Sequence, residues 1–526
     1  SLALADSGVT DWSHHDERSA AFFALGIAKT TGSAVVIVTT SGTAAAELHP
    51  ALAEAINGRV PLIAITADRP TALRNVGAPQ TIDQQDLFGR SVKWSHDIEV
   101  PPDPREAIDL ATRMWVEAMS PPAGPVHLNL RFDEPLMPTD AVTSAADGIP
   151  DVAIGRCEPD ESAIASLAAD LSGRRGIVIA GTDSEPGLAE AAAVFAAAAN
   201  WPILADPLSG LRAGHHDRSH VLAASDALSW AGFLDAAQPE AVVRFGGIPT
   251  SKPIWQWLGN HREVPQVFIE PAGWRDPTFS ASVVLRSEVV PTLHLLAKAM
   301  GDTTETSWMT RWQNADRAAA AAVSGVIEGN PFPNEPMVAR IVSEALPDPG
   351  VLWVASSMPV RDLDAVMLPT ERRVRVLANR GANGIDGFVS TALGSGAVSG
   401  VATVALAGDL SMLHDLSALA TAARLDLPVT IVAVNNDGGG IFHLLPQAGH
   451  DHFERHWGTP HGLDLAAVAT ALGVESETVS DASRLTELVS TPPAGPRFIE
   501  VRTDRTANAD LHRRIRSAVV ESLAQI

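Results

Sequence analysis

Two short polar motifs in the last third of the chain could hold a cation. Gly408-Asp409 ends one apolar run, and Asn435-Asn436 ends the next. The segment between them has apolar residues at helical spacing, so the pattern predicts a strand, a helix and a second, parallel strand. Both motifs are then expected at the carboxyl edge of one sheet, where open α/β sheets bind ligands.

The residue types at this edge suit a particular cation. One carboxylate with one or two carbonyl oxygens fits Mg²⁺, which prefers hard oxygen donors and completes its octahedron with phosphates and water. The sequence therefore predicts a metal-bridged diphosphate site. The structural alternative is an aspartate that caps a helix, followed by a turn-forming Asn-Asp-Gly sequence.

Apolar runs of strand length, separated by helical patterns, occur along most of the chain. A Pro-Pro-Ala-Gly-Pro turn also occurs twice, at 121–125 and 492–496, each time before a short apolar segment. These patterns predict α/β domains with parallel sheets. The predicted strands are 34–39, 61–66, 176–180, 202–205, 241–245, 266–270, 401–407 and 428–434.

The length of 526 residues is too great for one core and favours three domains. We expect an α/β protein with three doubly wound parallel-sheet domains, at residues 1–142, 151–300 and 334–526. A linker is expected after Pro138, and Asn334 is the predicted N-cap of the first helix in the third domain.

Composition excludes several classes of function. The net charge of -24 argues against nucleic acid or an anionic membrane as a partner. Cys157 is the single cysteine, so an intramolecular disulfide is excluded. The longest apolar runs are too short to span a membrane.

Longer motifs extend over all three predicted domains. In chain order they are HDER, TSGTAAAELHPAL, TADRP, GAPQTIDQ, SSMPVRDLD, NRGANGIDG and NNDGGGIFHLLP. Together they resemble the motifs of the SEPHCHC synthase family, thiamine diphosphate enzymes of menaquinone biosynthesis. The resemblance implies a cytoplasmic enzyme that decarboxylates 2-oxoglutarate and adds the resulting carbanion to isochorismate in a 1,4-addition. It also implies a homodimer at least, and commonly a homotetramer.

The resemblance also implies how the cofactor is held. Thiamine diphosphate would bind through Mg²⁺, or Mn²⁺, with Asp409, Asn436 and the Gly438 carbonyl as metal ligands. Glu17 of a neighbouring chain would face N1′ of the aminopyrimidine. Taken alone, Glu17 is typical of an acid at a helix start, but its agreement with the metal motif favours the cofactor role. The further implied cofactor contacts are Ser357, Ile385, Gly408 and Ile441.

Both implied substrates are dicarboxylates, so the pocket needs guanidinium groups that bind carboxylates in a bidentate manner. Each arginine taken alone is more often a surface residue, and the apolar residues could equally belong to a core. The implied substrate-binding residues are Arg69, Gln80, Arg275, Ser357, Arg361, Arg380, Phe442 and Leu445. With Glu17, the implied catalytic residues are Arg361, Arg380 and Ile385, the last as the apolar wedge that bends the cofactor.

Two other readings of these motifs are open. Acetolactate synthases and simple 2-oxoacid decarboxylases share the cofactor motif but lack the NRGANGIDG loop. A degenerate protein could bind the cofactor without turnover, although Glu17 argues against this. Family members also carry a Cys-Pro-Gly-Ser-Arg loop upstream of HDER, and this chain starts after that point. In a protein that lacks the loop we expect weak folding and poor use of isochorismate.

Overall fold

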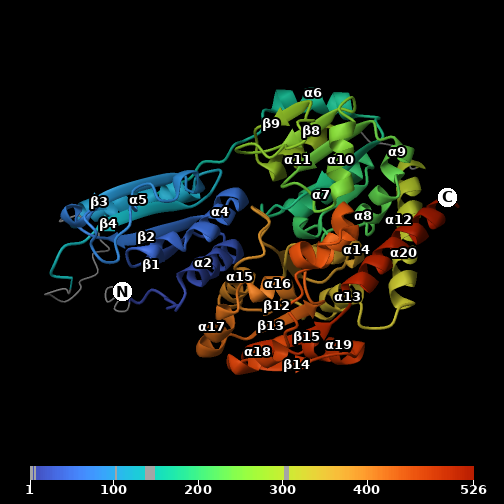
Figure 1. Cartoon of the computed structure of the whole chain (residues 1–526). Helices are drawn as coiled ribbons and strands as arrows, with labels where there is room; N and C mark the ends of the chain where they lie inside the picture. Colours follow the sequence, from blue (N-terminus) through green and yellow to red (C-terminus); the bar gives the residue numbers. More distant parts are fainter. Residues whose placement is uncertain (1–3, 5–6, 101–102, 137–147, 301–306) are drawn as a thin grey trace.

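The computed structural model describes residues 4, 7–100, 103–136, 148–300 and 307–526. Three sheets form an N-terminal, a middle and a C-terminal domain (Figure 1). Every sheet pairing among these residues is parallel. The predicted fold class is confirmed. The domain limits stay predictions, and most of the predicted linker lies outside the described residues.

The N-terminal sheet has four strands in the order β1-β2-β4-β3. The predicted strands 34–39 and 61–66 are β1 and β2, and β2 continues to Asp68. The strands are β1 Val35–Thr39, β2 Leu62–Asp68, β3 Trp94–Glu99 and β4 Val126–Arg131. The helices are α2 Glu17–Thr31, α3 Thr43–Ala46, α4 His49–Gly58 and α5 Pro104–Met119.

The middle sheet has five strands in the order β6-β5-β7-β8-β9, and four of them match predicted strands. The strands are β5 Gly176–Ala180, β6 Ile203–Ala205, β7 Ala241–Phe245, β8 Gln266–Ile269 and β9 Val283–Leu285. The helices are α6 Glu161–Leu171, α7 Leu188–Ala199, α8 Ser225–Trp230, α9 Phe233–Ala237, α10 Lys252–Asn260 and α11 Val289–Ala299, followed by α12 Ser307–Glu328.

The C-terminal sheet has six strands in the order β11-β10-β12-β13-β15-β14. The strands are β10 Gly350–Val354, β11 Val374–Leu377, β12 Ala402–Gly408, β13 Val429–Asn435, β14 Glu475–Thr478 and β15 Arg497–Arg502. The helices are α13 Glu335–Ala345, α14 Met358–Val366, α15 Phe388–Gly396, α16 Asp409–Leu413, α17 Ser417–Leu425, α18 Leu465–Ala471, α19 Ala482–Ser490 and α20 Arg505–Leu523. Asn334 caps α13 as predicted, because its side chain accepts from the Met337 N–H.

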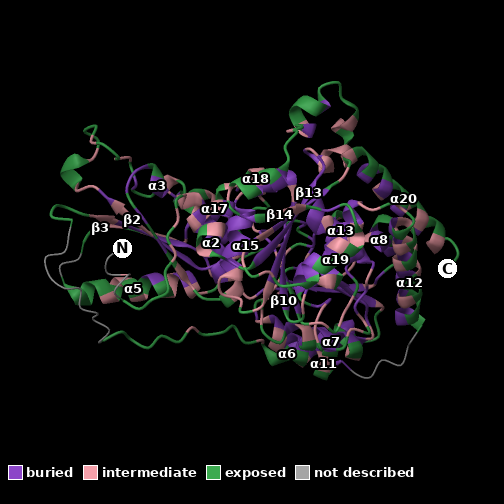
Figure 2. Cartoon of the chain, turned by 90° about the horizontal axis from the view of Figure 1, so that it is seen from below, coloured by how far each residue is buried: buried purple, intermediate pink, exposed green. Residues whose placement is uncertain are grey.

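Burial explains why the central strands are continuous apolar runs. All seven residues of β13 are buried, as expected for a parallel strand with helices on both faces. Figure 2 shows the sheets buried and the outer helix faces exposed. None of the described helices is both long and apolar enough to cross a membrane.

Two glycines allow helix α2 of the N-terminal domain to pack directly on helix α15 of the C-terminal domain. A Cβ at Gly26 would lie 1.9 Å from the Thr391 carbonyl oxygen, and one at Gly394 would lie 2.0 Å from the Phe23 carbonyl oxygen. Because each helix lacks a side chain where the other backbone passes, the two helices fix one domain on the other.

Candidate active site

Asp409 and Gly438 lie together at the carboxyl edge of the C-terminal sheet. Gly408 is the last residue of β12, Asp409 begins α16, and β13 ends at Asn435. The backbone N–H of Gly438 donates a hydrogen bond of 2.8 Å to Asp409 Oδ2. The structure therefore brings together two of the predicted metal ligands.

Asn436, the third predicted ligand, has one unused amide atom. Its Nδ2 donates to Glu335 Oε1 at 2.8 Å. Its Oδ1 is buried and has no hydrogen-bond partner among the described residues. Buried amide oxygens are rarely left unpaired, because this costs about 1–3 kcal/mol. The preceding Asn435 instead donates to Glu500 Oε1 at 2.6 Å, so Asn436 is the asparagine that can bind a cation.

Glu335 fixes the Asn436 amide and was not predicted as a site residue. It is 3% exposed, and its Oε1 also accepts from Thr503 Oγ1 at 3.1 Å. Burial, together with the nearby Asp362 carboxylate, raises the pKa of Glu335 to about 7. Because Nδ2 of Asn436 is held by this carboxylate, Oδ1 is directed away from it.

His461 is a second residue that sequence reasoning missed. Its Nε2 lies 3.2 Å from Asp409 Oδ2, and its backbone N–H donates to Asp437 Oδ1 at 2.8 Å. Neither Glu335 nor His461 belongs to a motif beside the ligands. Their distance along the chain left no local signal that could have identified them.

The donors at this edge fit a divalent cation with a diphosphate. Asp409 is 2% exposed, and burial raises the pKa of Asp409 above its ordinary value. A bound cation would offset that desolvation. A Cβ at Gly408 would meet no heavy atom within 4 Å, so the backbone is open on that side. Among the described residues, no three His, Cys, Asp or Glu side chains form an alternative metal cluster.

The structure places Arg361 and Arg380 close to each other, and nearby carboxylates, among them Asp364, act on both at longer range. Arg361 donates to the Ser357 carbonyl oxygen. Neither guanidinium forms an ion pair with a described carboxylate. Burial lowers the pKa of both groups, and the charge of Arg361 lowers that of Arg380 further. Ser357 has a φ of 72°, a strained conformation that is often found at functional sites. This arrangement suits an incoming carboxylate.

The predicted apolar contacts are not core residues. Ile385, Ile441 and Phe442 are half-buried, and Leu445 is 39% exposed. Ile441 and Phe442 lie in a 3₁₀ turn, η4 Gly440–Leu444, that directly follows the candidate ligands. These side chains are therefore available to line a pocket.

Glu17 is the first residue of α2 and is half-buried. Asp16 caps the helix by accepting from the Ser19 N–H at 3.1 Å. The Ser19 hydroxyl donates to Asp415 Oδ1 at 3.2 Å, so the helix start is anchored after α16 of the same chain. The Glu17 carboxylate makes no hydrogen bond or ion pair within the described chain. The Glu17 carboxylate is also not among the hydrogen-bond partners of Asp409. Within a single chain, Glu17 therefore has no described partner.

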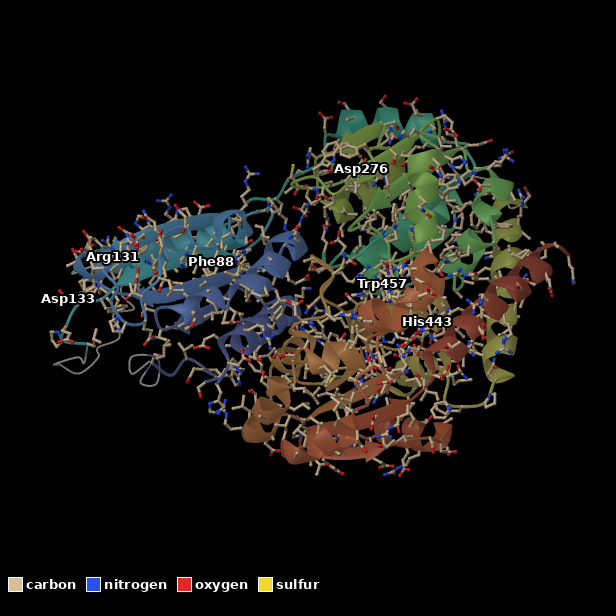
Figure 3. All side chains as sticks on the ribbon, in the orientation of Figure 1. Phe88, Arg131, Asp133, Asp276, His443 and Trp457 are labelled. Atoms are coloured by element: carbon tan, nitrogen blue, oxygen red, sulfur yellow. The ribbon has the colours of Figure 1, made fainter. Side chains whose placement is uncertain are left out.

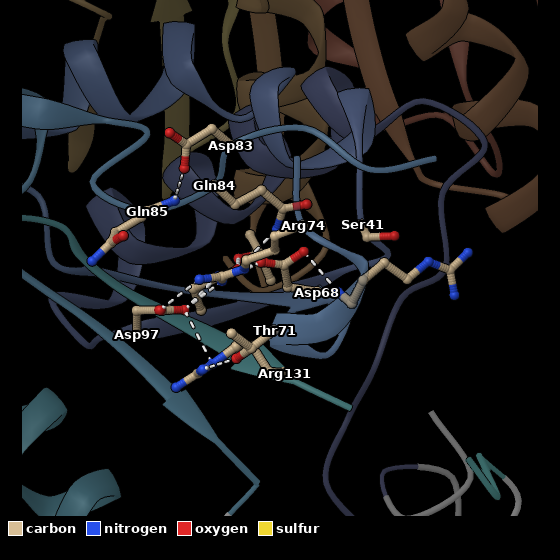
Figure 4. Close-up of polar contacts among 12 residues, drawn as sticks. Ser41, Asp68, Thr71, Arg74, Asp83, Gln84, Gln85, Asp97 and Arg131 are labelled. Carbon is tan, nitrogen blue, oxygen red and sulfur yellow. Dashed lines mark hydrogen bonds and ion pairs between the residues drawn. The ribbon is translucent and has the colours of Figure 1, made fainter. Parts of the chain in front are cut away.

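Arg69 and Gln80 lie in the segment that follows β2, which ends at Asp68. Figure 4 shows Asp68, Arg74 and Asp97 in contact at this carboxyl edge of the N-terminal sheet. Asp68 accepts from the Arg69 backbone N–H at 2.7 Å. Arg74 bridges Asp68 and Asp97, at 2.5 and 2.8 Å. The Arg69 guanidinium has no ion-pair partner among the described residues. Among the described residues, no hydrogen bond joins the segment that carries Arg69 and Gln80 to the C-terminal domain.

His127 is a buried residue of β4 that should make the stability of the protein depend on pH. Burial lowers the pKa of His127 to about 4. As the pH falls below the ordinary histidine pKa of 6.5, the His127 side chain binds a proton in the unfolded chain but stays neutral in the folded chain. The free energy of unfolding should therefore fall by up to about 1.4 kcal/mol per pH unit between pH 6.5 and 4. His127→Gln should lose less thermal stability than the native protein between pH 7.5 and 5.5. Replacement of the exposed His96 by Gln should leave the pH dependence of thermal stability as it is in the native protein. Equal losses of thermal stability in all three proteins would contradict the assignment of this dependence to His127.

Arg275 is held apart from the other predicted residues. Its Nε donates to Glu270 Oε2 at 2.8 Å, and Glu270 also pairs with Arg59 at 2.6 Å. The adjacent Asp276 lies on the middle domain, away from His443 on the C-terminal domain (Figure 3). The geometry of one chain gives no support to a substrate role for Arg275, which stays a prediction.

Family models match all three domains. They are the N-terminal TPP binding domain of thiamine pyrophosphate enzymes at residues 2–87, the middle domain at 158–354 and the C-terminal TPP binding domain at 367–501. Solved structures share the fold, and two of them cover nearly the whole chain. They are benzoylformate decarboxylase from Polynucleobacter necessarius and a thiamin diphosphate-dependent enzyme from Mycobacterium smegmatis. Their TM-scores are 0.70 and 0.69, at 18% and 19% identity, over 96% and 95% of this chain and 94% of each structure.

Curated relatives match nearly the whole chain. The 2-succinyl-5-enolpyruvyl-6-hydroxy-3-cyclohexene-1-carboxylate synthase of Geobacillus thermodenitrificans is 41% identical, covering 99% of this chain and 91% of the relative. The synthase of the same name from Chloroflexus aurantiacus is 42% identical, covering 98% and 90%.

Proposed function

Because this chain belongs to the family of 2-succinyl-5-enolpyruvyl-6-hydroxy-3-cyclohexene-1-carboxylate synthases, we propose that two copies build each active site between them. One chain supplies Glu17, and the other supplies Asp409 and Asn436. The enzyme acts in menaquinone biosynthesis. It decarboxylates 2-oxoglutarate and transfers the four-carbon unit to isochorismate. The assembly is a homodimer at least, and a homotetramer by resemblance.

The metal in this proposal is Mg²⁺, or Mn²⁺. Asp409 gives a carboxylate oxygen, Asn436 its amide oxygen and Gly438 its backbone carbonyl, and Gly408 leaves its backbone open toward the diphosphate. The observation that carries the proposal is the buried Oδ1 of Asn436, which has no partner among the described residues, two positions before Gly438, whose N–H contacts the Asp409 carboxylate. Such a pair of hard oxygen donors matches the preference of Mg²⁺.

Thiamine diphosphate, when bound, supplies the carbanion chemistry, and the protein binds and orients the reacting groups. Glu17 holds a proton at N1′ of the aminopyrimidine. Ile385 and Ile441 support the ring system, and the Ser357 region contacts the cofactor and substrate. The apolar side chains of Phe442 and Leu445 exclude water from the reacting carboxylate.

Arg361 and Arg380 bind substrate carboxylates, because two half-buried guanidinium groups that form no ion pair with a described carboxylate are free to form bidentate hydrogen bonds with a dianion. By resemblance, Arg69 and Gln80 of the partner chain complete the isochorismate side. Arg275 is part of the proposal on resemblance alone.

The identity of the substrates is tested by product analysis. The protein with thiamine diphosphate and Mg²⁺ should convert 2-oxoglutarate and isochorismate to the cyclohexene product, and should give no acetolactate from pyruvate alone. Acetolactate formation would favour the acetolactate synthase reading. Tight cofactor binding without turnover of either substrate set would favour the degenerate reading.

Replacement of Arg380 by Ala should raise KM for a dicarboxylate substrate by roughly 10–100-fold, since hydrogen bonds to charged groups contribute about 1.5–3 kcal/mol. Steady-state kinetics with each substrate varied in turn would show which carboxylate Arg380 binds. Arg373, which pairs with Asp348 at the surface, offers a matched control, and Arg373→Ala should keep native KM values. Unchanged KM values in Arg380→Ala would remove Arg380 from the substrate site.

A further inference from the structure

Glu54 is a buried carboxylate of the N-terminal domain that binds a loop of the C-terminal domain. It lies on α4 and is 2% exposed. Its Oε1 accepts from the Gly381 N–H at 2.8 Å, and its Oε2 accepts from the Ala382 N–H at 2.7 Å. Both oxygens of one side chain are therefore used to hold two consecutive residues of the NRGANGIDG loop.

Lys29 of helix α2 completes this contact. Its Nζ lies 3.2 Å from Glu54 Oε1. The same ammonium donates to the Ala378 carbonyl oxygen at 2.7 Å and reaches Asn379 Oδ1 at 3.4 Å. The Lys29–Glu54 pair is thus neutralised internally, and its remaining hydrogen bonds go to the segment 378–382.

Close packing reinforces these hydrogen bonds. A Cβ at Gly381 would lie 2.4 Å from the Glu54 carbonyl oxygen and 2.5 Å from the Gly58 backbone nitrogen. Only glycine therefore fits at this position, and the loop backbone lies directly on helix α4. The backbone is fixed on both sides of Arg380.

Arg380 needs such a support. Its guanidinium is half-buried beside the like charge of Arg361. The Glu54 carboxylate attracts it, but no described carboxylate lies close enough to form an ion pair with it. A free loop would let the side chain turn toward water, away from Arg361. We propose that Glu54, with Lys29, is a positioning residue that holds Arg380 ready for the substrate carboxylate. This inference rests on the substrate role proposed for Arg380.

The inference gives each N-terminal domain two tasks. Its Glu17 serves the site of a neighbouring chain, whereas its Glu54 orients the substrate loop of its own chain. A change at Glu54 should therefore alter substrate binding and leave the cofactor ligands intact.

Glu54→Gln tests the inference with little change in shape. An amide has one acceptor oxygen, so its NH₂ group must face one of the two loop N–H groups. We expect KM for the dicarboxylate bound by Arg380 to rise at least about 10-fold, with kcat within about 3-fold of native. The Kd of thiamine diphosphate with Mg²⁺, measured by calorimetry, should change much less than KM, because the proposed metal ligands Asp409 and Asn436 lie outside this loop.

Asp316 of the middle domain provides a matched control. It also accepts from two consecutive backbone N–H groups, those of Ala223 and Ala224, at 3.1 and 2.8 Å. Asp316→Asn should lower the thermal midpoint in the same way as Glu54→Gln but leave KM native. An equal rise of KM in the two variants would show a general loss of folding and overturn the inference.

A double-mutant cycle separates this inference from the proposed role of Arg380. If Glu54 acts through Arg380, Glu54→Gln should raise KM no further in an Arg380→Ala background. A rise in KM for Arg380→Ala with none for Glu54→Gln would overturn the positioning role alone. No rise for Arg380→Ala would instead overturn the substrate role on which it rests.

Discussion

Glu17→Gln is expected to lower kcat by roughly 10²–10⁴-fold, the range for loss of a positioned acid–base group. An amide cannot hold and release the proton at N1′ of the aminopyrimidine. The cofactor should still bind, because its diphosphate is held by the C-terminal domain. Product formation and calorimetry with thiamine diphosphate and Mg²⁺ would measure the two effects separately.

Glu161→Gln is a matched control for this change. Asp160 caps α6 and Glu161 is its first residue, just as Asp16 and Glu17 begin α2. The two variants remove the same charge from the same helical position. Native activity is expected for Glu161→Gln, and activity within a few-fold of native in Glu17→Gln would reduce Glu17 to a helix-start acid.

Asp409→Asn is expected to weaken the binding of thiamine diphosphate with Mg²⁺ on the order of 100-fold or more, because it removes the charged metal ligand. The thermal stability of the cofactor-free protein should not fall with this change. Asp409 is buried at a cost, so the neutral variant should have an equal or higher thermal midpoint in the absence of metal. Calorimetry and thermal unfolding, with and without Mg²⁺, would measure the two effects.

Asp426→Asn is the control for this prediction, since Asp426 is an exposed helix C-cap in the same domain. It should bind the cofactor with native affinity. Native cofactor affinity in Asp409→Asn would show that Asp409 only caps α16, the structural alternative raised by the sequence.

Local patterns were enough to predict the strands of the sheets and the oxygen-bearing side chains at their carboxyl edges. Continuous apolar runs identified β12 and β13 because parallel strands are buried on both faces, and Asp409 and Asn436 lie next to those runs. Glu335 gave no such signal. It contacts Asn436 across 101 positions of the chain, and only the tertiary fold brings the start of α13 to the end of β13.

Glu54 shows the same limit. It lies two residues after the motif TSGTAAAELHPAL, and its partners Gly381 and Ala382 are more than 300 positions away. Its spacing on α4 is typical of an ordinary helix residue. The approach of α2 to α15, which requires glycine on both helices, places α4 against the loop. Roles that depend on such contacts between domains could not be predicted from local sequence.

Hybrid assemblies test most directly whether each active site needs two chains. Glu17→Gln and Asp409→Asn should each be inactive alone. In a mixed dimer, one site would have both native residues and the other would have neither. A randomly mixed 1:1 population should therefore regain about one quarter of native activity. If differently tagged mixed dimers are isolated and remain inactive, Glu17 and Asp409 of different chains do not share a site, and the account is wrong.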